Sequence, residues 1–134
     1  MHYVIAFVVY CAVVFLMAFV WNIALFRDSY SSLAGEFLRE PPLFASGLAA
    51  IAIQAIAMVT AFGLLYPTSQ MDPLQGMKIA FIVNIGTVTY GALVIPGKFD
   101  IASVGSWISL ETAYGLVVTV LVGLALAAVW TYAA

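Results

Sequence analysis

Residues 3–26, YVIAFVVYCAVVFLMAFVWNIALF, determine the class of this protein. They contain no charged side chain and one amide, Asn22. An α-helix rises about 1.5 Å per residue, so roughly 20 apolar residues cross a hydrocarbon core about 30 Å thick. The run does not alternate apolar with polar side chains, as the strands of a membrane β-barrel do. It therefore predicts a membrane-spanning α-helix.

Three further apolar runs follow along the chain. They cover residues 43–66, 77–96 and 107–132. The third is the shortest, and the stem of Lys78 can extend it while the ammonium group reaches the membrane surface. The sequence therefore predicts an all-α integral membrane protein with a single domain, residues 1–134. Its fold would be a four transmembrane helix bundle with spans near 3–26, 43–66, 77–96 and 107–132.

The overall composition agrees with a membrane protein. Of 134 residues, 66% are hydrophobic and 7% are charged, whereas a soluble domain carries about 25% charged residues. The mean hydropathy is +1.16. The net charge of −2 offers no basic stripe for nucleic acid. We expect the lipid bilayer as the surroundings and no nucleic-acid partner.

The charges in the loops predict an orientation. Four spans place both termini on one side of the membrane, together with Lys78. Arg27, Arg39 and Lys98 lie on the other side. Because basic residues concentrate on the cytoplasmic side, the loop with the two arginines is predicted to be cytoplasmic and the termini to be extracytoplasmic.

The first loop has a pattern of its own. Tyr30, Leu33, Phe37 and Leu38 would share one face of a helix. This spacing is typical of a short amphipathic helix at the membrane surface. An ordinary polar loop is the alternative, and the sequence leaves both open.

Known catalytic motifs are absent from the sequence. There is no phosphate-binding glycine loop, HExxH, CxxC or Ser-His-Asp set. The single histidine is His2 and the single cysteine is Cys11. We therefore expect no catalytic residue, no metal site and no cofactor, and we do not expect an enzyme.

Polar residues inside the spans are the candidates for function. Asn22, Tyr90 and Glu111 come from the first, third and fourth spans and lie at a similar depth. They form a candidate polar layer, which could be a hydrogen-bond cluster or a solute pocket. A carboxylate within a span is costly and by default marks function. Glu111 also lies near the start of its helix, where the helix dipole favours an anion, so a structural role is the alternative.

Small side chains recur on the fourth span. Gly115, Thr119, Gly123 and Ala127 follow one another every four residues. Such a row lets another helix approach closely within a membrane. It predicts a helix-packing face, whose partner could be an internal helix or another subunit.

Aromatic, small and acidic residues also follow a particular order: Trp21, Tyr30, Leu-Ala-Gly at 33–35, Tyr90, and Glu-Thr-Ala-Tyr-Gly at 111–115. In this order the chain resembles a family of small uncharacterised bacterial membrane proteins, a domain of unknown function. The resemblance implies four spans over the whole chain and a place in the bacterial inner membrane. It implies no activity. The family carries Asp and Asn shortly after the tyrosine of the third span, whereas residues 91–94 here are apolar.

Two functions remain from the sequence. The preferred expectation is an accessory or assembly subunit without chemistry of its own, acting through helix packing with copies of itself or with a larger membrane complex. The alternative is a small homo-oligomeric transporter or channel for a proton, a cation or a small solute, built around Asn22, Tyr90 and Glu111.

Overall fold

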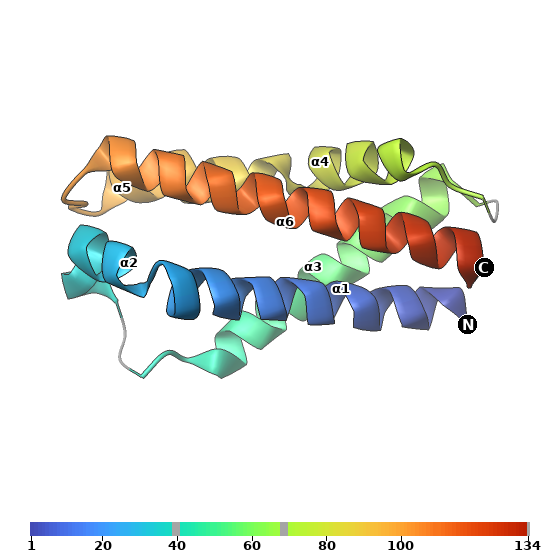
Figure 1. Ribbon diagram of the computed structural model, residues 1–134, viewed down its shortest axis with the longest axis horizontal. Coiled ribbons are helices and arrows are strands. Elements are labelled where there is room, and N and C mark those ends of the chain that lie inside the picture. The colour runs from blue at the N-terminus through green and yellow to red at the C-terminus, as the bar shows by residue number, and fades with distance from the viewer. Residues whose placement is uncertain (39–40, 68–69, 134) are drawn as a thin grey trace.

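The computed structural model describes residues 1–38, 41–67 and 70–133, and it is all-α (Figure 1). Four helical segments are long and apolar enough to cross a membrane: His2–Leu25, Phe44–Leu65, Pro73–Lys98 and Val104–Tyr132. The predicted fold class is confirmed, and the chain is a multi-pass membrane protein. Both termini lie at one end of the bundle, and the short helix α2 lies at the other end.

The first span joins two kinds of helix. Helix α1 (His2–Phe19) continues into a π-helical segment, η1 (Val20–Leu25). The chain turns at Phe26 into α2 (Arg27–Ala34) and then a 3₁₀ turn, η2 (Gly35–Phe37). Of the two alternatives for the first loop, the short helix is the one observed.

Helix α2 is held against the bundle by one of its faces. Tyr30 and Ala34 are buried on this face, with Trp107 and Ile101 as neighbours in the same hydrophobic cluster. The N–H of Ala102 also donates a hydrogen bond of 3.0 Å to the carbonyl oxygen of Leu33. Phe37, predicted for the same face, remains about half exposed. The surface helix is therefore anchored mainly by its first two turns.

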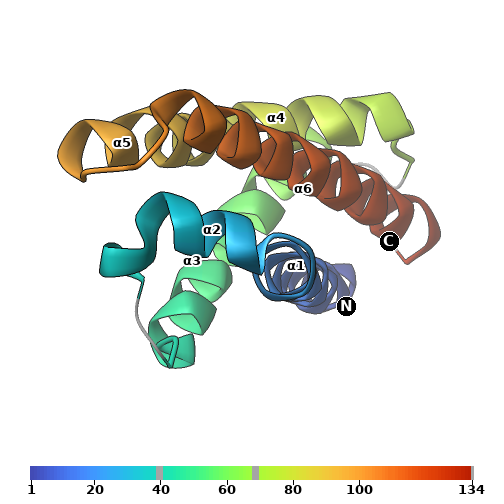
Figure 2. The same cartoon turned by 60° about the vertical axis from the view of Figure 1, so that its left-hand side comes forward.

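Helix α3 (Phe44–Leu65) crosses the other spans obliquely (Figures 1 and 2). Its second half carries the buried side chains Met58 and Phe62, which belong to the main hydrophobic core. Every residue from 44 to 50 is exposed. The first turns of α3 therefore stand away from the bundle.

The third span is longer than predicted at both ends. It consists of α4 (Pro73–Thr89), a π-helical segment η3 (Tyr90–Val94) and α5 (Ile95–Lys98). It begins at Pro73 instead of Met77 because Asp72 and Gln75 form a reciprocal cap: Asp72 accepts from the Leu74 N–H at 3.0 Å, and Gln75 accepts from the Asp72 N–H at 3.1 Å. At the other end the helix passes through Pro96, the second residue after the π segment.

The fourth span, α6 (Val104–Tyr132), lies alongside α4, and Figure 2 shows the two as one layer with α1 and α3 beneath it. The core between the layers ends at Trp130, which is fully buried. Its indole N–H donates a hydrogen bond of 3.0 Å to the carbonyl oxygen of Tyr66, the residue directly after α3. This bond ties α6 to α3 near the end where the termini lie.

Candidate functional site

Helices α4 and α6 pack closely together, and both line the cavity described below. All four residues of the predicted helix-packing face, Gly115, Thr119, Gly123 and Ala127, are buried. A Cβ atom placed on Gly123 would lie 2.6 Å from Cα of Met77, and one placed on Gly115 would lie 2.5 Å from a methyl group of Val88. The sequence left the partner of this face open. In the structure its neighbour is the internal helix α4.

The other two members of this face also meet α4. The side-chain amide of Asn84 donates a hydrogen bond of 3.2 Å to the hydroxyl of Thr119. A Cβ atom on Gly76 would lie 2.7 Å from Cβ of Ala127. Small side chains therefore let the two backbones come together, with one polar bond inside the contact.

A cavity of about 110 Å³, which we call the inner cavity, lies between the four spans. Six polar side chains line it, and each span contributes at least one: Tyr10 from α1, Gln54 from α3, Asn84 and Thr87 from α4, and Glu111 and Tyr114 from α6. Glu111 is the one carboxylate in this lining, and no described residue of the lining is basic. Valine side chains, among them Val14 and Val118, line the rest. The inner cavity is thus a largely apolar compartment that holds several polar groups and a single acidic group.

Hydrogen bonds orient the amides around the inner cavity. The hydroxyl of Tyr10 donates to Oε1 of Gln54 at 3.4 Å, which links α1 to α3. The bond from Asn84 to Thr119 links α4 to α6. Intramembrane amides commonly join helices in this way. Here the same amides also present polar atoms to a cavity.

Glu111 is held from outside the spans. The hydroxyl of Tyr30, on the surface helix α2, donates a hydrogen bond of 2.5 Å to Oε1 of Glu111. This length is typical of a bond from a hydroxyl group to a carboxylate. The other oxygen, Oε2, lies 3.1 Å from where a Cβ of Gly91 would stand. A larger residue at position 91 would therefore crowd the carboxylate.

The turn that carries Gly91 is itself fixed to α6. The indole N–H of Trp107 donates a hydrogen bond of 2.9 Å to the carbonyl oxygen of Gly91, within the π segment η3. An i→i+5 turn leaves the regular helical ladder, and π turns of this kind are common at functional sites. Trp107 lies one helical turn before Glu111 on α6, and its hydrogen bond fixes η3 beside the carboxylate.

Tyr30 is placed so that it remains a donor at neutral pH. Its side chain is 5% exposed, and its ring meets Trp107 edge to face at 5.7 Å. Burial raises the pKa of the Tyr30 hydroxyl well above its usual range, and the bond to Glu111 raises it further. The indole of Trp21 acts in the opposite direction, but its buried N–H does not reach the geometry of a hydrogen bond.

The structure places the three residues of the candidate polar layer in different surroundings. Glu111 borders the inner cavity. The amide of Asn22 donates to the carbonyl oxygen of Ala18 at 2.9 Å, and its side chain lines a separate pocket on the outer side of the bundle. Tyr90 is 50% exposed, and its hydroxyl accepts a 3.4 Å hydrogen bond from Lys98.

The polar residues near Glu111 could have been found from their spacing in the sequence, in addition to their depth in the membrane. Tyr114 follows Glu111 by three positions, and Thr87 follows Asn84 by three. Residues at this spacing share one face of a helix. Helical phase combined with depth would have selected them together.

The described part of the chain holds no group of three or more His, Cys, Asp or Glu side chains that could bind a metal ion. No family model, curated protein or solved structure matches the chain. The resemblance to the bacterial four-span family therefore stays a prediction, while four helices long and apolar enough to cross a membrane are observed.

Proposed function

We propose that the protein is a small transporter or channel for a proton or a monovalent cation, with Glu111 as the binding group. One observation carries this proposal: a single carboxylate borders a cavity to which each of the four spans contributes at least one polar side chain. In a bilayer, such a residue commonly marks the path of an ion or a proton. We also propose that several copies of the chain assemble in the membrane as a homo-oligomer.

The charge of the inner cavity supports a partner with one positive charge. Glu111 contributes one negative charge when ionised, and the described lining holds no Lys, Arg or His. One proton or one monovalent cation would neutralise it. Divalent ions such as Ca²⁺ usually take several carboxylate ligands. The hydroxyl and amide oxygens of Tyr10, Gln54 and Thr87 are suitable ligands for a partly dehydrated cation.

The size of the inner cavity supports a small solute. Its volume of about 110 Å³ holds a few water molecules, each of which occupies about 30 Å³ in the liquid. A proton carried through ordered waters, or one ion with part of its hydration shell, fits this volume. Tyr30 lies next to the inner cavity, because its hydroxyl donates a hydrogen bond to Glu111, which lines the cavity.

The proposal is tested by flux measurements on the purified full chain in liposomes. An internal pH-sensitive dye would report proton entry driven by a potassium diffusion potential, and fluxes of sodium and potassium would be measured in parallel. We expect a flux above that of protein-free liposomes, which Glu111→Gln abolishes. Glu36→Gln, at an exposed carboxylate on η2, is the matched control and should retain the flux. No flux from the wild-type protein, or equal flux from Glu111→Gln, would contradict the proposal.

An accessory or assembly subunit is the second proposal. Its support is the apolar outer surface, which includes the exposed residues Ile53 and Ile56 on α3 and Ile82 on α4. Because the small-residue face of α6 meets α4, a partner would bind these outer faces. Gentle solubilisation followed by native mass spectrometry tests it: a complex with other subunits supports it, and a clean monomer contradicts both this proposal and the homo-oligomer.

The orientation belongs to the proposal as well. We infer that the side of Arg27 and Lys98 faces the cytoplasm and that the termini face outward, from the distribution of basic residues.

A further inference from the structure

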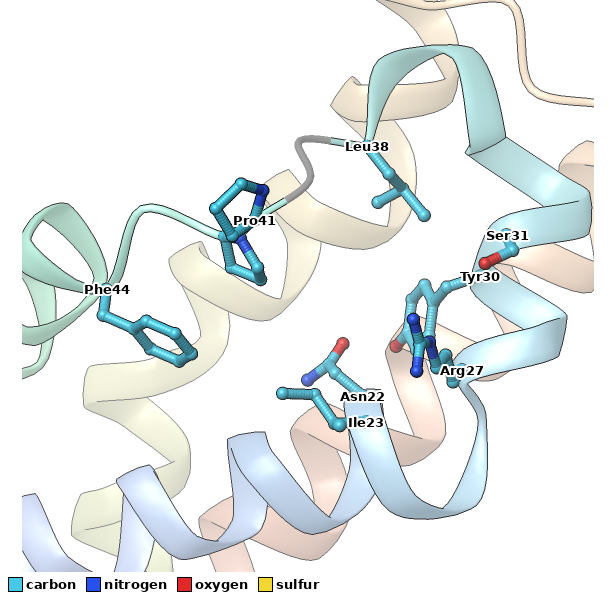
Figure 3. A pocket seen from close by; sticks show the side chains of 9 residues that line it. Asn22, Ile23, Arg27, Tyr30, Ser31, Leu38, Pro41 and Phe44 are labelled. Atoms are coloured by element: carbon cyan, nitrogen blue, oxygen red, sulfur yellow. The ribbon is translucent and has the colours of Figure 1, made fainter.

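A second and larger pocket lies on the outer side of the bundle. It has a volume of about 680 Å³ and lies between η1, α2 and the first turns of α3 (Figure 3). It shares Asn22, Ile23, Pro42 and Phe44 with a neighbouring pocket of about 250 Å³. The two pockets therefore form one elongated depression, which we call the outer groove. The exposed first turns of α3 leave it accessible from the side.

The outer groove changes from polar to apolar along its length. Near α2 it is lined by Arg27, Tyr30 and Ser31, which lie opposite Phe44 in Figure 3. Farther along it is lined by Phe15, Phe19, Leu48 and Ile51.

The polar end of the outer groove lies nearer the membrane surface than the apolar end. Arg27 lies two residues beyond Leu25, the last residue of the first span, so it lies at the level of lipid headgroups. Phe15 lies about 15 Å deeper than Leu25 along the span, at 1.5 Å per residue. The polar end of the outer groove is therefore at the surface and the apolar end is in the hydrocarbon region.

We propose that the outer groove binds an anionic phospholipid, with its phosphate at Arg27 and Ser31 and one acyl chain between η1 and α3. The polarity of the groove matches that of the lipid from headgroup to chain. A guanidinium group has five N–H donors, so Arg27 can bind a phosphate while keeping other contacts. The volume lies within the range of roughly 300–1,000 Å³ that is usual for small-molecule pockets.

A transmembrane helix of a partner fits the outer groove less well. Such a helix is about 10–12 Å wide with its side chains and continues through the membrane surface. Leu38 and Pro41, which belong to the chain between α2 and α3, line the groove at its surface end. A helix leaving the membrane would meet them, whereas a lipid ends there with its headgroup.

Lipid retention tests the charge at the polar end. The protein would be released for native mass spectrometry from bilayers with equal amounts of phosphatidylglycerol and phosphatidylcholine. One basic residue near the surface favours an anionic lipid by about fivefold. We expect this preference in the wild-type protein, its loss in Arg27→Gln, and its retention in Lys98→Gln. Lys98 is an exposed cation outside the groove.

A second variant tests the apolar end. Gly47 lines the groove, and a Cβ there meets nothing within 4 Å. Gly47→Phe would add a bulky side chain to the groove at a position where the Cβ has open space, so we expect it to reduce the retention of both lipids. Gly86→Phe is the control, because Gly86 is also exposed and open but lies on α4 outside the groove.

Three results would overturn the proposal: equal retention of the two lipids by the wild-type protein, an unchanged preference in Arg27→Gln, or unchanged lipid binding in Gly47→Phe. Disulfide-linked dimers of Gly47→Cys, in a Cys11→Ala background, would instead assign the groove to a second copy of the chain.

Discussion

Tyr30 and Glu111 are 81 positions apart in the sequence and are joined by a hydrogen bond of 2.5 Å. The tyrosine belongs to a helix outside the spans, whereas the carboxylate borders a cavity between them. Tyr30 also lines the outer groove. One side chain therefore connects the outer groove, where we propose that a lipid binds, with the carboxylate where we propose that an ion binds.

Removing the Tyr30 hydroxyl should destabilise the protein. Tyr30→Phe leaves Oε1 of Glu111 without its donor, and loss of a bond to a partly buried carboxylate costs about 1–3 kcal/mol. Thermal unfolding in detergent measures the effect. Ser32→Ala is the control on the same helix, since its exposed hydroxyl bonds only to the Ser29 carbonyl oxygen in the structure. Equal stability of the two variants would show that the bond between Tyr30 and Glu111 contributes little.

Alkaline pH should weaken the protein through Tyr30. Burial and the bond to Glu111 raise the pKa of Tyr30 in the folded state, while in the unfolded state the hydroxyl loses its proton near about pH 10. The folded protein therefore holds this proton more tightly. The resulting stability is fully present below about pH 10 and is lost as the pH rises further. We expect the unfolding temperature to fall more steeply between about pH 10 and 12 in the wild-type protein than in Tyr30→Phe; parallel curves would contradict this.

The contact between α4 and α6 should not tolerate one added methyl group at Gly123. Its Cβ would lie 2.6 Å from Cα of Met77 and 2.8 Å from the Met77 nitrogen. Because these are backbone atoms, the helices must separate, at a cost of about 1–3 kcal/mol. Gly86→Ala, on α4 with open space around its Cβ, should be neutral or slightly stabilising. The two variants are compared by thermal unfolding, and similar shifts would show that the close contact is unimportant.

Cysteine labelling tests the orientation. Glu36 and Gln70 are exposed at opposite ends of the bundle, on η2 and before α4. In a Cys11→Ala background, we expect an impermeant thiol reagent added to intact cells to label Gln70→Cys and not Glu36→Cys. The reverse result would place the arginine loop outside and the termini in the cytoplasm.

The spans were predictable because length and hydrophobicity suffice for them. No period had to be found in residues 3–26, since a continuous apolar run has one structural solution in a bilayer. The predicted start of the third span, Met77, lies four residues after the observed one, because the continuous apolar run begins later than the helix. The signal for the observed start was a capping box, Asp72 followed three residues later by Gln75, with Pro73 at the first helical position.

The surroundings of Glu111 were harder to predict because depth gives no direction around a helix. Asn22 and Tyr90 have a depth similar to that of Glu111, but each lies in a π-helical segment. A π turn contains an extra residue, so it rotates the following side chains away from the regular phase. In the structure, one of these residues lines the outer groove and the other is half exposed. Helical phase taken from sequence fails where π turns occur.

The glycines between α4 and α6 have a mechanical consequence. Gly76 and Gly123 bring the two backbones together so closely that a Cβ atom on either glycine would clash with the opposite helix. Helices α1 and α3 meet the inner cavity through longer side chains, Tyr10 and Gln54, which can change rotamer. The pair α4–α6 would therefore move as a stiff unit while α1 and α3 rock against it. The inner cavity would therefore widen between the pair α4–α6 on one side and helices α1 and α3 on the other.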